Sequence, residues 1–444
     1  MVNLTDGNIK KNLIVFALPY LFSSFMQTFY GMVDLYVVGL YNATSSTSAV
    51  TIGSQVMHML TVIILGLAMG STVKIGTEIG RGDKSAVKKT IVNTFFLFTI
   101  IALVLTLLLL VFTKNIVALM LTPQEAVKEA VEYLRICFAG IPFIIFYNII
   151  SAIYRGMGDT KRPMYFVLVA CIVNIVLDFL FIGYLKMGAA GAALGTVISQ
   201  AVSVIISLIF IRKSENSIKL KKSDFVFDTN CCFKIFKIGL PISLQDGLIQ
   251  ISFLIITIIA NSRGLEISAA VGIVEKIIGF LFLVPSAFLA SVSAITAQNY
   301  GAGKKENARI ALRFALLVTV SWGILCSIYC QFLPNTLISL FTKDELVVKF
   351  GCQYLMSYVL DTVFAAIHFC FCGFFCGIQK SFLSFIQNII SILFARIPGA
   401  YFASVMWKEN LYPMGWAAPL GSILSALLCI CFYIFIRHKE KNKF

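Results

Sequence analysis

The 444-residue chain has the composition of a membrane protein. Hydrophobic residues make up 59% of it and charged residues 13%, with a mean hydropathy of +0.90, far more apolar than a soluble domain. The net charge of +15 does not predict nucleic-acid binding, because the basic residues are scattered between apolar runs. These runs are continuous rather than alternating, so they predict membrane-spanning helices and not barrel strands.

Twelve apolar segments follow one another, each close to the ~20 residues that a helix needs to cross a bilayer. The polar opening MVNLTDGNIKKN has no small-residue cleavage site, so we expect the first segment to stay as a helix. The sequence therefore predicts an all-α polytopic membrane protein with spans at 13–39, 49–73, 90–112, 133–154, 163–184, 188–211, 235–260, 268–294, 309–332, 351–376, 383–405 and 414–436.

The basic residues are distributed unevenly between the two sides of these helices. Most of the 36 Lys and Arg lie in the terminal segments and in the loops after the second, fourth, sixth, eighth and tenth expected helices. The positive-inside rule therefore places both termini in the cytoplasm. We expect a multi-pass protein of the cell (inner, cytoplasmic) membrane.

Short motifs recur in the second half of the chain. Leu18-Pro19 reappears as Leu240-Pro241, and Gly80-Arg81-Gly82 as Gly301-Ala302-Gly303. The most basic connection lies between these halves, so we expect an amino-terminal six-helix bundle, a basic cytoplasmic linker and a carboxy-terminal six-helix bundle at 1–212, 213–234 and 235–444. Six helices return the chain to the same side, which predicts two parallel repeats around a central cavity, a transporter architecture.

Polar residues in the first half fall at similar depth in the membrane. Asn174 and Asp178 of NIVLDF lie one helical turn apart on one face, and Asp34 and Thr196 lie at comparable depth on other helices. Tyr30 adds a hydroxyl one turn below Asp34. An ionised carboxylate at mid-membrane costs at least about 2.5–3.5 kcal/mol. This oxygen-rich set therefore predicts a site for a proton or a small cation.

Three other interpretations stay open at this point. A membrane-embedded enzyme could use Asp34 and Asp178 as an acid pair, but the YD and GxGD sequences of intramembrane aspartyl proteases are absent. A flippase for a lipid-linked saccharide needs several basic residues inside the first half, and none lies between Lys11 and Lys74. A non-transporting receptor or scaffold predicts no ion-dependent flux. We expect a transporter and not an enzyme.

Five motifs resemble, in order and spacing, those of the multidrug and toxic compound extrusion (MATE) family: VDLYVVG, GRGD, YRGMGDTKRP, NIVLDF with MGAAGAALGT, and QNYGAG. The resemblance covers nearly the full length. It implies an antiporter that exports organic, cationic amphipathic compounds by alternating access, driven by H⁺ or Na⁺. It implies contact with small organic substrates and membrane lipid, with no cofactor beyond the coupling ion, no nucleic acid and no required protein partner, so that a monomer is expected.

The resemblance also implies roles for individual residues. In the prokaryotic branch with an amino-terminal cation site, the matching residues are Tyr30, Asp34, Asn174, Asp178 and Thr196. If the ion is Na⁺, its ligands would be Asp34, Asn174, Asp178 and Thr196.

Pro19 matches a proline at which the first helix of that branch is proposed to bend as the site fills. Asp361 matches a second family acid in the other half. The family's glutamate on the seventh helix has no counterpart in PISLQDGLIQISF. This difference favours the amino-terminal half as the cation site.

Several other intramembrane polar residues are candidates for lining the cavity. Glu275 and Lys276 lie together in GIVEKIIGF, although Lys276 can also snorkel or pair with a carboxylate. His368 is a further candidate, with packing in the core as its alternative. Arg396 has no assigned partner. The glycines of MGAAGAALGT are expected to permit turns and close helix contact.

Overall fold

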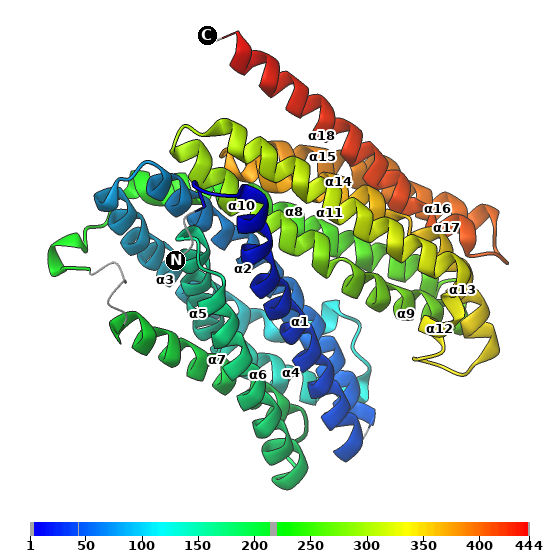
Figure 1. The fold of residues 1–444 in the computed structure, drawn as a ribbon. Helices are drawn as coiled ribbons and strands as arrows, with labels where there is room; N and C mark the ends of the chain where they lie inside the picture. Colours follow the sequence, from blue (N-terminus) through cyan, green and yellow to red (C-terminus); the bar gives the residue numbers. More distant parts are fainter. Residues whose placement is uncertain (1–3, 43, 214–219, 443–444) are drawn as a thin grey trace. The chain divides into compact units, whose positions relative to one another are not determined.

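The computed structural model describes residues 4–42, 44–213 and 220–442, and all regular secondary structure within them is helical. The elements, shown in chain order in Figure 1, are α1 (Ile9–Tyr41), α2 (Thr44–Gly80), α3 (Lys84–Leu119), α4 (Gln124–Ala139), α5 (Ile141–Gly156), α6 (Lys161–Asp178), the π-helix η1 (Phe179–Tyr184), α7 (Gly188–Lys213), the 3₁₀-helix η2 (Lys222–Asp224), α8 (Thr229–Asn261), α9 (Leu265–Leu281), α10 (Leu283–Gly301), α11 (Lys305–Phe332), α12 (Pro334–Ile338), α13 (Glu345–Tyr358), α14 (Asp361–Gly377), α15 (Ser381–Ser391), the π-helix η3 (Ile392–Arg396), α16 (Ile397–Met406), α17 (Tyr412–Gly415) and α18 (Ala417–Lys441).

The helices confirm the predicted multi-pass fold. Within the described residues, 10 helices are long and apolar enough to cross a membrane, or up to 12 spans are present if two bent pairs of helices each form one span. The pairs are α4 with α5, bent by 47°, and α13 with α14, bent by 43°. The first bend has a local cause, because Gly140 caps the end of α4 and α5 begins with a proline in its first turn, which has no N–H to continue the helical ladder.

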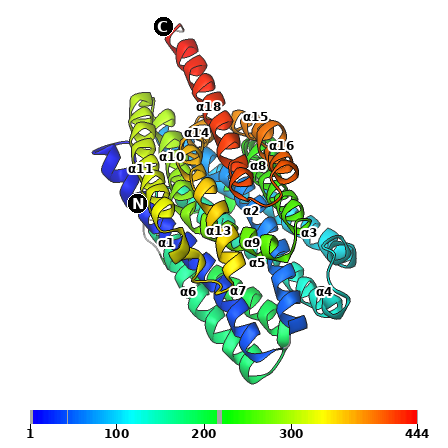
Figure 2. The ribbon, with the colours of Figure 1, turned by 90° about the vertical axis from the view of Figure 1, so that its right-hand side faces the viewer.

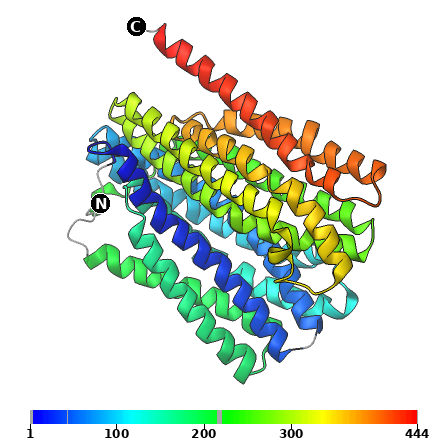
Figure 3. The ribbon, with the colours of Figure 1, turned by 45° about the vertical axis from the view of Figure 1, so that its right-hand side comes forward.

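Unit 1, one of two compact units in the chain, contains Leu18–Gly239. Its helices α6 and α7 lie side by side, with η1 following α6 at the end of the pair, as Figure 3 shows from a second direction. Its core includes Ile75, Ile150 and Tyr154. The π-helical turns of η1 begin directly after Asp178, and such distortions are frequent at functional sites.

Unit 2 contains Asn3–Ala17 and Leu240–Phe444. Its helices α10, α11 and α14 pack together, and Figure 2 shows them beside one another. The segment before α1 is attached to this unit, because Asn299 Nδ2 donates to the carbonyl of Leu4 at 2.9 Å. The helix α1 therefore begins in unit 2 and continues in unit 1.

The predicted division of the chain at 212/213 and 234/235 stays a prediction. Residues 214–219 of the expected linker lie outside the described residues. The helix α8 begins at Thr229, belongs to unit 1 as far as Gly239 and continues in unit 2. The chain thus passes from one unit to the other within two helices, α1 and α8.

Candidate functional site

Three helices of unit 1 supply the five residues of the predicted cation site. Tyr30 and Asp34 lie on α1, Asn174 and Asp178 in the last turns of α6, and Thr196 on α7. Because Asn174 and Asp178 are four residues apart on one helix, their side chains share a face. The fold brings that face against α7.

Asp34 is the centre of the cluster. Its Oδ2 lies 3.4 Å from Thr196 Oγ1, and its carboxylate also faces the side chains of Asn174 and Asp178. The exposed fractions are 7% for Asp34, 1% for Asn174 and 0% for Asp178. The structure therefore brings these four predicted residues together in a nearly closed site.

Tyr30 joins the cluster through its hydroxyl, which interacts with Asp34 and with the side-chain amide of Gln200. Gln200 is also buried. Gln200 is not among the residues predicted from the sequence, although a signal was present, since it lies one turn after Thr196 on the same face of α7.

The two carboxylates have no positively charged partner among the described residues. Asp34 Oδ1 and both carboxylate oxygens of Asp178 are buried and accept no hydrogen bond there, and the side-chain oxygen of Asn174 is also without a partner. Two carboxylates in contact away from water repel each other, and one proton or cation between them removes that repulsion. Carboxylate, amide and hydroxyl oxygens are also the ligands that hard cations prefer.

Gly195 sets the distance between α6 and α7 at this site. A Cβ atom on Gly195 would lie 2.6 Å from Asp178 Oδ1 and 3.6 Å from Asn174 Nδ2. A side chain at this position would therefore displace the carboxylate. This agrees with the close helix contact expected for MGAAGAALGT.

In unit 2, Asp361 is paired with a base. Arg396 Nη2 donates to Asp361 Oδ2 at 3.2 Å, and both side chains are buried. The guanidinium also stacks over the Phe253 ring, 5.3 Å from its centroid. The partner of Arg396 could not be predicted from the sequence, because the pair joins α14 to η3, which only the fold brings together. The charge of Asp361 is thus compensated within the protein.

The three cavity candidates in unit 2 have different surroundings. Glu275 Oε2 lies 3.5 Å from Thr257 Oγ1, and its Oε1 is buried without a hydrogen-bond partner in the described chain. Lys276 is exposed. The ring of His368 stacks on that of Phe369 with centroids 5.0 Å apart, as expected for a packed histidine. Their role in lining a path stays a prediction.

Pro19 lies inside α1, which continues past it to Tyr41. Its carbonyl accepts a hydrogen bond from Ser23 Oγ at 2.8 Å. The proposed role of Pro19 as a hinge stays a prediction.

The sequence profile of the MatE family matches residues 19–180 and 241–402. The chain belongs to the MatE family. Because the two matches fall in the two halves, this MatE protein contains two family repeats, as the recurring motifs predict. Membership of a transporter family confirms the resemblance and the expectation of a transporter instead of an enzyme.

Relatives of this MatE protein cover nearly its whole length. "Probable multidrug resistance protein YpnP" of Bacillus subtilis is 25% identical over 447 residues, covering 100% of this chain and 98% of the relative. The multidrug export protein MepA of Staphylococcus aureus (strain N315) is 26% identical, covering 90% and 89%. A solved structure described as the outward-facing conformation of a multidrug resistance MATE family transporter has a TM-score of 0.92 at 22% identity, covering 99% and 98%. This structural likeness establishes the fold.

Proposed function

We propose that this MatE protein is an antiporter that exports organic, cationic amphipathic drugs or toxic compounds in exchange for H⁺ or Na⁺. The names of its full-length relatives, which are multidrug resistance and multidrug export proteins, support the substrate class. Their bacterial origin supports the cell membrane as its location. The distribution of Lys and Arg supports cytoplasmic termini.

The observation that carries the proposal is the pair of buried aspartates in unit 1. Asp34 faces Asp178, and three of their four carboxylate oxygens accept no hydrogen bond from the described residues. Such a pair requires a positive charge from outside the chain. Asn174 and Thr196 supply further oxygens, so the coupling ion is either a shared proton or Na⁺ held by these four residues.

Exchange follows from competition for the same negative charge. When the coupling ion leaves, Asp34 and Asp178 repel each other, and a cationic substrate in the same unit relieves that repulsion. A ligand shifts a conformational equilibrium only by the difference in its affinity for the two conformations. Exchange therefore requires the ion and the substrate to prefer different conformations. Pro19 precedes Asp34 on α1. We propose that α1 bends at Pro19.

The test is efflux of a fluorescent cationic dye from proteoliposomes under an imposed pH gradient or Na⁺ gradient. We expect one gradient to drive flux, and Asp34→Asn and Asp178→Asn to abolish it while the protein stays folded. Asp83→Asn is the matched control, since this exposed aspartate caps α3 by accepting from Ala86 N at 2.9 Å, which Asn can also do. Full gradient-driven flux in both site variants would contradict the proposal.

A further inference from the structure

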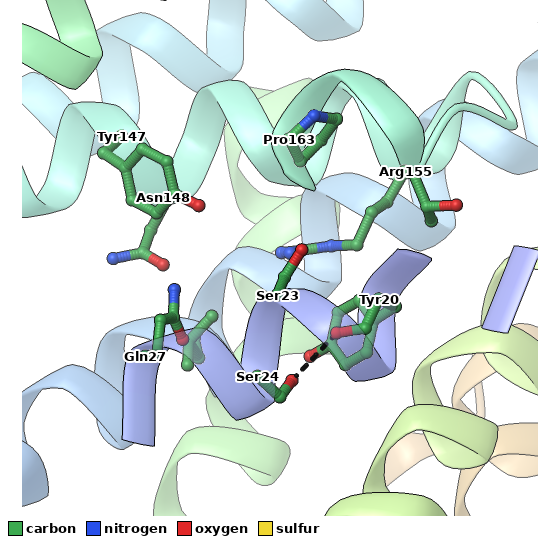
Figure 4. A pocket seen from close by; sticks show the side chains of 10 residues that line it. Tyr20, Ser23, Ser24, Gln27, Tyr147, Asn148, Arg155 and Pro163 are labelled. Carbon is green, nitrogen blue, oxygen red and sulfur yellow. Dashed lines mark hydrogen bonds between the residues drawn. The ribbon is translucent and has the colours of Figure 1, made fainter. Parts of the chain in front are cut away.

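A polar cavity in unit 1 lies between α1, α2, α5 and the start of α6. Its volume is about 60 Å³. Figure 4 shows Arg155 extending from α5 toward Ser23 on α1, while Tyr147 and Asn148 face Gln27. None of the residues of the cation site lines this cavity.

Arg155 is a buried charge without a carboxylate partner. Among the lysines and arginines of the described chain, Arg155 and Arg396 are the two that are buried, each about 8% exposed. Arg396 pairs with Asp361. The Arg155 guanidinium makes no ion pair and donates no hydrogen bond within the described residues, and it stacks over the Tyr20 ring at 5.5 Å from the centroid.

Stacking does not compensate for this burial. A cation–π contact contributes about 0.5–2 kcal/mol, whereas removing an ion from water costs several kcal/mol in a protein. A guanidinium also has five N–H donors to satisfy. The side chain of Arg155 therefore retains both charge and hydrogen-bonding capacity that a ligand can use.

The neighbouring polar groups are neutral or already engaged. Ser23 Oγ donates to the Pro19 carbonyl at 2.8 Å, and Asn148 Nδ2 donates to the Ile144 carbonyl at 2.8 Å. The nearby carboxylate of Asp159 is paired with Arg162 at 3.3 Å and accepts from the backbone N–H groups at the start of α6. No acidic residue lines the cavity. Its net charge is therefore positive.

We propose that this Arg155 cavity binds the oxyanion group, a carboxylate, phosphate or sulfonate, of a small amphiphile. A guanidinium matches the planar, two-oxygen edge of such groups and binds it by two parallel hydrogen bonds. The cavity exceeds the space that one water needs, and Leu65 and Pro163 line it beside the polar residues, so an apolar tail has side chains to contact there. The site is separate from the cation site, and its binding does not depend on the proposed function.

The experiment is calorimetric titration of the full-length protein in a neutral detergent, without an ion gradient, with octyl phosphate. Octyltrimethylammonium, which has the same tail and the opposite charge, is the ligand control. We expect Arg155→Gln to weaken octyl phosphate binding at least tenfold and Arg155→Lys to weaken it less, because lysine keeps the charge but loses the paired hydrogen bonds. Arg212→Gln removes the same charge from an exposed arginine in the last turn of α7, away from the cavity lining, and should leave binding unchanged.

Two further ligands distinguish the source of the oxyanion. Tighter binding of dioctanoyl phosphatidylglycerol than of octyl phosphate would indicate a lipid headgroup, and the reverse order would indicate a free amphiphile. Either result supports the proposed site if the binding is weakened by substitution of Arg155. Equal affinity in Arg155→Gln and Arg212→Gln, or no binding of either phosphate ligand, would overturn it. If Arg155→Gln does not fold, the comparison of Arg155→Lys with Arg212→Lys decides in the same way.

Discussion

Arg396 compensates the buried charge of Asp361, whereas Asp34 and Asp178 face each other with no base beside them in the described chain. Both pairs lie within membrane-spanning segments, but they have different chemical capacities. A carboxylate that already accepts from a guanidinium gains little from an external cation. A pair of carboxylates that repel each other is stabilised much more by an external cation. This difference favours unit 1 over unit 2 as the location of the coupling site.

The pair in unit 2 is expected to be structural. Asp361→Asn should lower thermal stability strongly, by about 3–5 kcal/mol, because it leaves the Arg396 guanidinium buried without a counter-charge. The double variant Asp361→Leu/Arg396→Leu should be less destabilised than the single one. Thermal unfolding of the purified protein in detergent measures both. Arg437→Gln, which removes an exposed arginine of the same unit, is the control, and equal destabilisation of single and double variants would refute a structural pair.

Gly195 offers a test of the cation site that changes no charged residue. Gly195→Ala places a methyl group 2.6 Å from Asp178 Oδ1, so we expect ion-driven efflux to fall at least tenfold because the carboxylate must move. Gly31→Ala on α1 is the matched control, since nothing lies within 4 Å of its added Cβ. Both variants should fold. Unchanged efflux in Gly195→Ala would show that the position of Asp178 is not critical.

Much of the fold was predictable because hydropathy reports the length and number of membrane-spanning segments directly. The predicted segment 133–154 overlaps the bent pair α4 and α5, and 351–376 overlaps α13 and α14. These bends were not predicted. They depend on local packing, as at Gly140, where a Cβ would lie 2.4 Å from Val197 Cγ2 on α7.

The three polar sites differ in how far the sequence could reveal them. Asn174 and Asp178 are one turn apart, so their shared face follows from helix geometry alone. The contact of Asp361 with Arg396 spans 35 residues, and the cavity around Arg155 needs four helices in place. Sequence spacing does not encode such long-range contacts, and they require the fold.

Close contact between the backbones of α2 and α8 gives a third prediction. A Cβ on Gly70 would lie 2.3 Å from the carbonyl oxygen of Ile235, and one on Gly239 would lie 2.3 Å from that of Leu67. Either Gly→Ala substitution should destabilise unit 1 by about 1–3 kcal/mol, because a backbone atom cannot rotate away. Gly279→Ala, where the added Cβ meets nothing within 4 Å, should be neutral or stabilising. Unfolding midpoints in detergent compare the three, and equal midpoints would refute the close contact.

The segment before α8 should lose its attachment to α3 in acid. The backbone N–H of Lys221 and the ammonium of Lys88 lower the pKa of Asp224, and the ammonium of Lys89 lowers the pKa of Asp228. A depressed pKa means that the stabilisation is fully present above the ordinary aspartate pKa of about 3.9 and is lost as pH falls through the lower folded-state value. We expect hydrogen-exchange protection of this segment, corrected for the intrinsic rate at each pH, to fall in that window.

The ion pair between Lys89 and Asp228 sets the pH at which this protection is lost. Lys89→Gln removes the largest cause of the lowered pKa of Asp228, so protection should be lost at a higher pH than in the parent. Lys84→Gln, an exposed lysine at the start of the same helix, should leave the transition in place. Identical transitions in both variants would mean that the ion pair with Lys89 does not hold the segment and that backbone contacts, such as that of Asn93 Nδ2 with the Val226 carbonyl at 3.1 Å, are sufficient.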